Sequence, residues 1–483
     1  MRFVPRSGRA RSLVAVAAAA LLLVPIAWMW WTSLLPDSYD VAEMGYADYG
    51  GGPRTGHDHH GHGMPVADLV EQRGGPADVE RTLTVRTDGN RYTVNGTSPG
   101  PELRVTQGDL VEVTLVNEDL EEGTTLHWHG IDVPNAMDGV AGVTQDAVMP
   151  GESFTYRFVA DRAGTYWYHA HQVSHEQVRR GVLGAVVVEP RRTSASSAPV
   201  EQVAVLHRYG STPTLNGKEG VQTVDVRTGD EVRVRVVNTD NALMPIWVTG
   251  APYRVLAVDG IDVHEPGDVS GLAVKLTAGA RVDLGVVVPD GGARVDFGAT
   301  TALVLGQDPT GGAAARAPRE FVDFLSYGTP ADPGVDLTRP DRDFDYRIGR
   351  RPGFLDGRPG VWWTVNGHLF PDIPMFMVDE GDVAVFHIEN DSGESHPMHL
   401  HGHHALVLSR DGEPASGSPW WIDSLEVGTG ETFDIALVAD NPGIWMDHCH
   451  NLEHAAEGLV AHLMYSGVRS SYRVGGDAHT HPE

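Results

Sequence analysis

The chain has 483 residues, 41% of them hydrophobic, so it is long enough for roughly three domains with hydrophobic cores. Acidic residues outnumber basic ones by 65 to 36, and the net charge of −29 argues against nucleic acid or an anionic membrane surface as the main partner. The single cysteine, Cys449, excludes an intramolecular disulfide, whereas histidine occurs 24 times.

An apolar segment near the N-terminus predicts export. Four arginines precede the uncharged residues 13–31, which as a helix would span roughly 28 Å at about 1.5 Å per residue, close to the thickness of a hydrocarbon core. The arginines predict that the N-terminus lies on the inner side of the membrane and the body on its outer side. We interpret residues 1–35 as an uncleaved signal anchor, because no clear small-residue cleavage site follows the segment; a cleaved signal peptide is the alternative.

Residues 36–76 are rich in Gly, Asp, Tyr and His and lack apolar periodicity, which predicts a flexible tether. Such a composition suits either copper or zinc binding or a solvated polar linker, and composition alone leaves both open. The histidines of this tract are His57, His59, His60 and His62.

The remaining chain, from about residue 78 to 465, shows short alternating segments between Gly and Pro turns, which predicts an all-β body. One pattern recurs three times: Asn-Gly, then Gly-Asp, then a strand that ends in an asparagine nine residues after the Gly-Asp glycine, at Asn117, Asn238 and Asn390. This repetition predicts three tandem β-sandwich domains of the Greek-key type. We expect them at residues 77–190, 200–328 and 355–468, followed by a flexible tail at 469–483.

The first and third repeats share more than one strand. The segment GESFTYRFVADRAGTYWYHAH (151–171) aligns without a gap with GETFDIALVADNPGIWMDHCH (430–450), and HWHG (127–130) matches HLHG (399–402). Together they hold four His-x-His pairs, and the middle repeat holds none. Alternate residues of a strand point the same way, so eight imidazoles can converge between the first and third domains. Eight neutral imidazoles suit a cluster of three copper ions, whereas buried without a metal they would be poorly compensated.

The same alternation explains the lone cysteine. Cys449 lies between His448 and His450, so it points the other way, into its own domain, where it can meet His396 and His454. One thiolate and two imidazoles in a β-sandwich form the ligand set of a blue, type 1 copper.

The first domain lacks these partners. It has Ala170 at the position of Cys449 and Thr124 at that of His396, although His175 matches His454. We therefore expect no type 1 site there, and a packing or hydrogen-bonding role for His175.

With these motifs the sequence resembles the multicopper oxidase family, specifically its three-domain, laccase-like members, from about residue 78 to 465. The motifs stand as HWHG from His127, YHAH from Tyr168, HPMHLHG from His396 and HCH from His448. The resemblance implies cupredoxin domains and four copper ions. It assigns His127 and His399 to the type 2 copper, His129, His169 and His450 to one type 3 copper, His171, His401 and His448 to the other, and His396, Cys449 and His454 to the type 1 copper.

The family's axial position at the type 1 copper falls on Leu459, and a noncoordinating leucine there predicts a high potential. The resemblance also implies the mechanism. A reductant gives one electron at a time at an exposed edge of His396 or His454, the electron passes from Cys449 to its two neighbouring histidines, and four electrons reduce dioxygen to two waters.

Two aspartates are candidate catalytic residues. Asp138, in MDGV, matches the family's proton-relay carboxylate, and an ordinary turn aspartate is the alternative. Asp423, in WIDS, would orient a type 1 histidine or hold a substrate proton, with a surface-loop role as the alternative. We expect His403 and His404 to pack or hydrogen-bond.

The methionines bear on the choice of donor. Met375, Met377, Met398 and Met446 are scattered, which is typical of core filler, and the chain has no methionine-rich insertion. This weakens specialisation as a cuprous-ion oxidase.

Three hypotheses follow. The first is a laccase-like oxidase of phenols, aromatic amines or related organic reductants, with dioxygen as acceptor, held at the outer face of the cell membrane. The second is a metallo-oxidase that converts Cu(I) to Cu(II) for copper tolerance. The third is a nonenzymatic copper-binding or electron-transfer protein, against which all eight cluster histidines argue, because electron transfer alone needs only the type 1 set.

Overall fold

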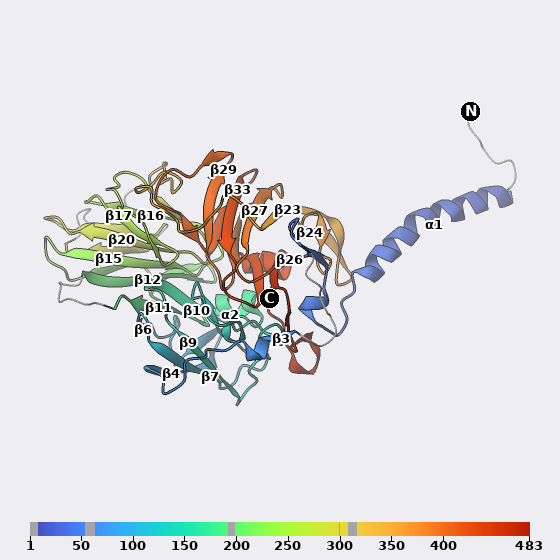
Figure 1. Cartoon of the computed structure of the whole chain (residues 1–483), viewed down its shortest axis with the longest axis horizontal. Helices are drawn as coiled ribbons and strands as arrows, with labels where there is room; N and C mark the ends of the chain where they lie inside the picture. Colours follow the sequence, from blue (N-terminus) through green and yellow to red (C-terminus); the bar gives the residue numbers. More distant parts are fainter. Residues whose placement is uncertain (1–7, 54–62, 192–198, 299, 308–315) are drawn as a thin grey trace.

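The computed structural model describes residues 8–53, 63–191, 199–298, 300–307 and 316–483. A β-rich body carries one long helix that projects from it (Figure 1). The helices are α1 (Gly8–Thr32), α2 (Ser174–Arg180) and α3 (Leu452–Ala456), with 3-10 turns η1 (Val41–Glu43), η2 (Val66–Asp68), η3 (Asn135–Met137) and η4 (Gly476–Ala478).

The first unit of the body is a sandwich of two four-stranded sheets around one apolar core. One sheet has the order β5-β4-β7-β9 and the other β6-β11-β10-β8. The bounds are β4 (Val79–Asp88), β5 (Arg91–Val94), β6 (Leu103–Thr106), β7 (Leu110–Asn117), β8 (His127–His129), β9 (Ser153–Val159), β10 (Gly164–His169) and β11 (Leu183–Glu189).

The second unit is again a sandwich, with sheets of order β13-β12-β15-β20-β17-β18 and β14-β22-β21-β16-β19. The bounds are β12 (Val200–Tyr209), β13 (Thr212–Leu215), β14 (Val221–Val224), β15 (Glu231–Asn238), β16 (Met244–Thr249), β17 (Arg254–Val258), β18 (Ile261–Asp262), β19 (Val274–Leu276), β20 (Arg281–Val287), β21 (Ala293–Asp296) and β22 (Ala302–Leu305).

The third unit pairs a sheet of order β2-β26-β35-β34-β28-β32 with one of order β25-β24-β23-β27-β33-β29-β30, in which β31 also pairs with β29. The bounds are β2 (Tyr46–Asp48), β23 (Arg342–Leu355), β24 (Arg358–Val365), β25 (His368–Leu369), β26 (Pro374–Val378), β27 (Val383–Asn390), β28 (His396–Leu400), β29 (Ala405–Arg410), β30 (Glu413–Pro414), β31 (Trp421–Ile422), β32 (Ser424–Val427), β33 (Thr432–Val438), β34 (Ile444–Cys449) and β35 (Val460–Tyr465).

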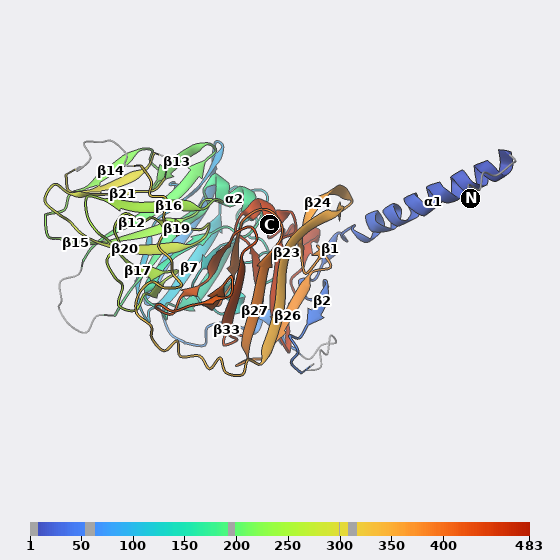
Figure 2. The ribbon, with the colours of Figure 1, turned by 90° about the horizontal axis from the view of Figure 1, so that it is seen from above.

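These three sandwiches confirm the predicted all-β architecture. The equivalent central strands are β7, β15 and β27, each of which ends at the asparagine of the repeated pattern, and each asparagine side chain is buried. Figures 1 and 2 place the second unit at the end of the body farthest from α1 and the third unit at the end from which α1 leaves. The third unit begins earlier than expected, because residues 342–348 pair with β27, ahead of the predicted boundary at 355.

The described residues of the predicted tether and tail are not flexible segments in the structure. They form short strands that pair with other strands. β1 (Ser38–Tyr39) pairs with β37 (Val474–Gly475), β2 extends the third unit's sheet beside β26, and β3 (Met64–Pro65) pairs with β36 (Val468–Arg469). Strands of two or three residues are too short to show an alternating pattern, which is why composition suggested a tether. The histidine tract at 57–62 lies outside the described residues.

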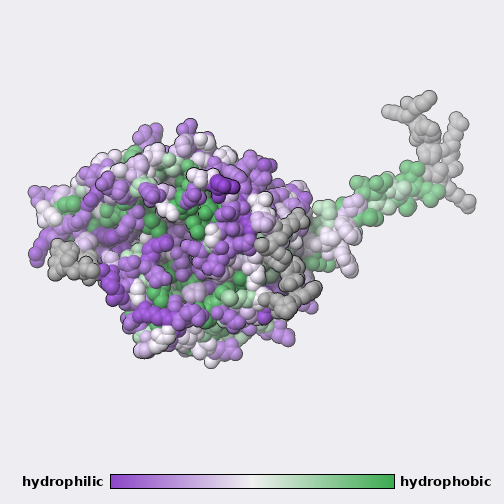
Figure 3. Space-filling view, viewed as in Figure 1, coloured by the Kyte–Doolittle hydropathy of each residue, from purple (hydrophilic) through white to green (hydrophobic). Residues whose placement is uncertain are grey.

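Helix α1 contains the one described segment that is long and apolar enough to cross a membrane, Ser12–Thr32. It stands away from the body as an apolar rod beside a largely hydrophilic surface (Figure 3). Its base is held by the hairpin between β23 and β24, where Gly357 N donates to Ser33 Oγ at 3.2 Å and Leu35 N to Asp356 Oδ1 at 3.3 Å. The helix therefore leaves the body next to the third unit.

Candidate metal centres

Strand pairing brings the four His-x-His pairs together. In the first unit β8 lies beside β10, with His127 opposite His169. In the third unit β28 lies beside β34, with His399 opposite His448. His171, His401 and His450 each follow a strand end by one or two residues, so all eight rings gather where the first and third units meet.

The eight rings form compact groups of possible ligand atoms. His127 Nε2 lies 3.4 Å from His399 Nε2, and His401 Nε2 lies 3.2 Å from His448 Nε2. Three groups have their ligand atoms within 4.8 Å of one another: His127 with His399 and His401, His127 with His129 and His169, and His171 with His401 and His448. His450 lies alongside, with its ring centroid 5.0 Å from that of His129 and 5.4 Å from that of His169.

Several buried ring nitrogens of this cluster make no hydrogen bond within the described part of the chain. They are His129 Nδ1, His169 Nε2, His448 Nδ1 and both nitrogens of His171 and His450. Burial first, and neighbouring imidazoles second, hold the pKa well below its ordinary value in His129, His169, His171, His399, His401 and His450. Neutral rings that lie together and keep ring nitrogens free of hydrogen bonds are the form that binds metal ions.

A second centre forms around the cysteine. Cys449 Sγ lies 3.6 Å from His396 Nδ1 and 3.7 Å from His454 Nδ1, and the two nitrogens are 3.1 Å apart. Burial raises the pKa of the Cys449 thiol well above its usual range. A bound cation reverses that preference, because a coordinating thiol is deprotonated outright.

Other residues orient this second centre. His396 Nε2 lies 2.7 Å from Ser392 Oγ, and His454 Nε2 lies 3.0 Å from Asn451 Nδ2, so both rings turn Nδ1 toward the sulfur. Cys449 N donates to Leu459 O at 3.2 Å, and Leu459 is fully buried in the core that contains the cysteine. The predicted axial position is therefore aliphatic and dry.

Asp138 lies inside the histidine cluster, fully buried. His127 Nδ1 is 2.9 Å from its backbone oxygen, and His401 Nδ1 is 3.0 Å from its Oδ2. The other nitrogen of each ring, Nε2, lies near the Nε2 of another cluster histidine. Asp138 thus sets the orientation of one histidine from each unit, which an ordinary turn aspartate facing solvent would not do.

Asp423 is also buried, which corrects its expected surface-loop role and its expected place beside a type 1 histidine. Its Oδ1 lies 3.2 Å from His129 Nε2, and its backbone oxygen lies 2.8 Å from His399 Nδ1. The reason is register: β32 runs beside β28 with Ser424 opposite His399, so Asp423 reaches the cluster end of β28 rather than the His396 end.

The second unit contributes a charge to this region, although it carries no histidine pair. Arg281, fully buried at the start of β20, donates to both carboxylate oxygens of Asp423, at 2.6 and 2.5 Å, and lies 3.4 Å from Asp259. Burial, and then the charge of Asp423, raises the pKa of Asp259 to about 6. Sequence reasoning missed this arginine; an Arg and an Asp alternating within the apolar run of β20 were the available signal.

Glu483 is a further residue that sequence reasoning missed. Its Oε1 lies 3.1 Å from His448 Nδ1 and 3.9 Å from His171 Nε2. The segment before it is held by Gln172, which donates to His479 O and accepts from His481 N, each at 2.8 Å. The predicted tail is thus docked on the cluster.

His403 and His404, which follow the third motif, contact side chains outside the two centres. His403 Nε2 lies 2.7 Å from Tyr465 Oη, and His404 Nδ1 lies 3.2 Å from Asp132. His175 is the second residue of α2 in the first unit, and its Nδ1 makes no hydrogen bond to a described residue. Thr124 Oγ1 in the same unit donates to Gln177 rather than facing a cysteine.

Comparisons with known proteins agree with this geometry. Two family models described as multicopper oxidase match residues 78–193 and 344–467. The crystal structure of a multi-copper oxidase from Pseudomonas thermotolerans is 31% identical, with a TM-score of 0.66, over 81% of this chain and 100% of that one. The chain belongs to the multicopper oxidase family.

Curated relatives of this multicopper oxidase are named for different activities. Laccase-1 of Botryotinia fuckeliana is 26% identical over 80% of this chain and 81% of its own length. An iron transport multicopper oxidase, fetC of Epichloe festucae, is 26% identical over 76% of this chain and 72% of its own. The multicopper oxidase is therefore a copper-binding oxidoreductase that uses dioxygen and an electron donor, and its three sandwiches are cupredoxin-like.

Proposed function

We propose that this multicopper oxidase takes single electrons from small organic reductants, such as phenols and aromatic amines, and uses them to reduce dioxygen to water. One observation carries the proposal: the triad of Cys449, His396 and His454 is joined through the cysteine's own chain neighbours to the cluster of eight histidines. A protein that only stored or transferred electrons would need the triad and not the cluster.

The donors present fit copper. Thiolate with imidazole selects a soft or borderline metal. The cluster supplies ring nitrogens that make no hydrogen bond to a described residue, and groups of three ligand atoms within 4.8 Å of one another. We assign four copper ions: the type 1 ion to His396, Cys449 and His454, the type 2 ion to His127 and His399, and the type 3 ions to His129, His169 and His450 and to His171, His401 and His448. Copper bound at these residues would supply one-electron oxidation of the donor and four-electron reduction of dioxygen.

The donor meets the protein at His454. His396 is fully buried, whereas the side chain of His454 is 13% exposed. The ring of Trp363 lies against His454 at a centroid distance of 4.4 Å and an angle of 39°. Trp363 is itself buried and so holds the ring of His454 in place, and we expect a planar aromatic donor to stack at the exposed part of that imidazole.

A metal-ion donor is the second candidate, because carboxylates also surround His454. Glu394 lies 3.9 Å from His454 Nε2, and the charges of Glu453 and Glu457 also act on its ring. Arg350 pairs with Glu394 at 2.7 Å and so offsets part of this negative charge. The remaining carboxylates would attract Cu(I) or another cation.

Protons for water formation would be held by the buried carboxylates at the cluster. Asp138 contacts His127 and His401, and its carboxyl group is the candidate relay. Asp423 pairs with Arg281 and lies beside His129, so we assign it to positioning that histidine rather than to moving a proton.

We place the body outside the cytoplasm, anchored by α1 with the N-terminus inside. The span Ser12–Thr32 has the length and composition for this, and four arginines precede residue 13. A removed signal sequence would leave the same body in the same compartment.

Oxygen uptake by the copper-loaded protein tests the proposal, with a panel of phenols and aromatic amines compared with Cu(I). Uptake with the organic donors at a higher kcat/KM than with Cu(I) supports an organic substrate. A higher kcat/KM with Cu(I), lowered in a Glu394→Gln variant, would assign the metal-ion substrate instead. Absence of uptake with every donor contradicts both.

A further inference from the structure

One face of the third unit's sheet is lined with methionines. Strands β26, β35 and β34 lie side by side, and their alternate residues face two different cores. One face carries Cys449 and the core of the third unit; the other carries Met375, Met377, Met446 and Met464 and packs against Met44 of the N-terminal segment. Except for Met398, the methionines judged scattered in the sequence are gathered in this layer.

A single histidine sits within the methionine layer. His462, on the middle strand β35, has Met446 directly opposite on β34 and Met375 directly opposite on β26. Directly opposed residues on neighbouring antiparallel strands have Cβ atoms about 5 Å apart, close enough for the thioether of Met446 and the imidazole of His462 to share one small ligand. The strand register therefore sets a thioether on each side of this imidazole.

The imidazole of His462 has no evident partner. The residue is 2% exposed, and neither ring nitrogen makes a hydrogen bond to any described residue. Leaving a buried polar group unsatisfied costs about 1–3 kcal/mol, so a histidine kept in an apolar layer is expected to bind something. Burial, followed by the charge of His448, lowers the pKa of His462 to about 4, which keeps the ring neutral and able to accept a metal ion.

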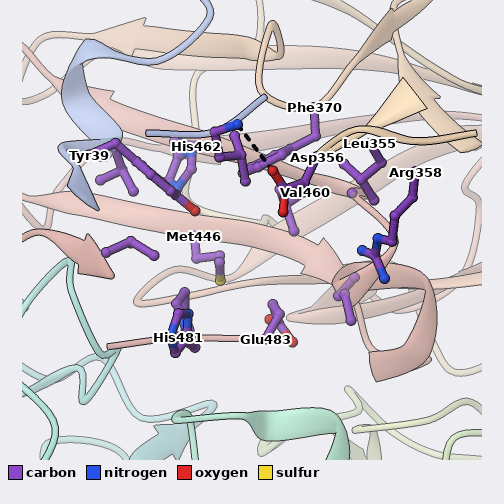
Figure 4. A pocket seen from close by; sticks show the side chains of 17 residues that line it. Tyr39, Leu355, Asp356, Arg358, Phe370, Met446, Val460, His462, His481 and Glu483 are labelled. Atoms are coloured by element: carbon purple, nitrogen blue, oxygen red, sulfur yellow. Dashed lines mark hydrogen bonds between the residues drawn. The ribbon is translucent and has the colours of Figure 1, made fainter. Parts of the chain in front are cut away.

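A cavity gives this histidine room for a ligand. Its volume is about 220 Å³, and His462, Met446 and His481 all line it, together with Glu483 (Figure 4). Its outer walls come from Leu35 and the β23–β24 hairpin at the base of α1. Glu483 lies beside His448 and Ser174, and Asp356 accepts from Leu35 N, so we assign the ligand to the thioether of Met446 and the imidazoles of His462 and His481.

We propose that His462, Met446 and His481 bind one Cu(I) ion in this cavity, in addition to the ions assigned to the two metal centres. Thioether and imidazole donors select Cu(I), whereas magnesium and calcium need oxygen ligands and structural zinc takes thiolates and imidazoles. The site lies on the opposite face of the sheet from Cys449, so it is separate from the type 1 centre.

The test counts Cu(I) ions in the fully reduced, copper-loaded protein, titrated without oxygen against a chromophoric Cu(I) chelator. The wild type should hold one more Cu(I) than the two metal centres account for. His462→Leu should lose that ion, and Met446→Leu should weaken its binding at least tenfold. Because leucine suits an apolar layer, His462→Leu is expected to fold, which its blue colour would verify.

Two controls make the result specific. Met464→Leu alters the same layer away from His462 and should retain the extra ion. Cys449→Ser should lose the type 1 colour and oxidase activity yet keep the extra Cu(I), so that failure of the proposed oxidase function and failure of this site are told apart. The inference is overturned if His462→Leu and the wild type bind the same number of Cu(I) ions with the same affinity, or if the wild type binds no extra ion.

Discussion

The first and third sandwiches place the same backbone around very different sites. Ala170 N donates to Val182 O at 3.1 Å, just as Cys449 N donates to Leu459 O at 3.2 Å, so the two strands end in the same way. In the first unit the facing residue, Thr124, bonds to Gln177. In the third unit the facing residue is His396, 3.6 Å from the thiol.

This difference shows how little the backbone of a sandwich decides by itself. Both units supply two His-x-His pairs to the shared cluster, because both keep the strand ends that aim them inward. Only the third adds three donors that meet on the other side of these strands: Cys449 on β34, His396 on β28 and His454 on α3. A second kind of centre therefore required three side chains and no new fold.

Substitution of the equivalent histidines His454 and His175 gives the largest expected difference between the third and first units. His454→Ala should remove the blue colour and lower oxidase turnover by more than about 10³-fold, because it deletes a ligand of the electron-accepting centre. His175→Ala should change turnover less than about twofold, because its unit lacks the other two donors. Visible spectra and steady-state oxygen uptake measure both; equal losses in the two variants would contradict the distinction.

The buried charge from the second unit is the next largest expected effect. Arg281→Met leaves Asp423 and Asp259 buried without their cation, so the free energy of unfolding should fall by about 3–5 kcal/mol. Urea denaturation measures it. Arg254→Met, which removes a partly exposed pair with Glu231, is the control and should cost less than about 1 kcal/mol.

Asp138 contacts one cluster histidine from each unit, so its substitution should affect the histidine cluster and not the type 1 centre. Asp138→Asn keeps the shape but removes the charge, and we expect oxidase turnover to fall about 10- to 100-fold while the blue colour of the type 1 centre is kept. Turnover and absorbance, measured on the same sample, separate the two effects. Loss of colour with turnover intact would contradict this placement.

Leu459 tests why the third unit's centre is expected to have a high potential. Leu459→Met conserves volume, so the protein should stay within about 1.5 kcal/mol of wild-type stability. A thioether in the axial position should lower the reduction potential of the type 1 copper, as a redox titration followed at its absorption band would show. An unchanged or higher potential would contradict the axial placement.

The smallest effect compares equivalent cross-strand pairs. Thr114 and Thr155 pair in the first unit, and at the equivalent place in the third His387 pairs with Asp434 at 2.6 Å. The hydrogen bond to Asp434, with the charges of Asp343 and Asp434, raises the pKa of His387 above its ordinary value.

The sign of the pH dependence follows from that raised pKa. The stabilisation is fully present below the unfolded-state pKa, about 6.5, and is lost as pH rises through the higher folded-state value. His387→Gln should lower the free energy of unfolding by less than about 1 kcal/mol at low pH, because the pair is exposed, and by less at high pH. Denaturation at a series of pH values measures it; a loss that grows with pH would contradict it.

The sequence predicted the features that follow from the two-residue alternation of strands and from the internal duplication. Alternation in strands placed His448 and His450 on one side and Cys449 on the other, and the gapless duplication paired the two units. Local pattern could not show that Asp423 lies opposite the cluster, because that depends on the register of β32 against β28. Nor could it show that Arg281 and Glu483 lie at the cluster, because Arg281 belongs to the second unit and Glu483 to the segment after the third.

The lone cysteine gives the most direct test of the central claim, that the third unit alone holds a type 1 copper and shares a histidine cluster with the first. Copper content per chain should be measured together with visible absorption for the wild type and Cys449→Ser. The account predicts blue colour in the wild type, and in the variant one copper ion fewer per chain and no blue colour. A variant that keeps the wild-type copper content and its colour, or that loses all copper while folded, would contradict it.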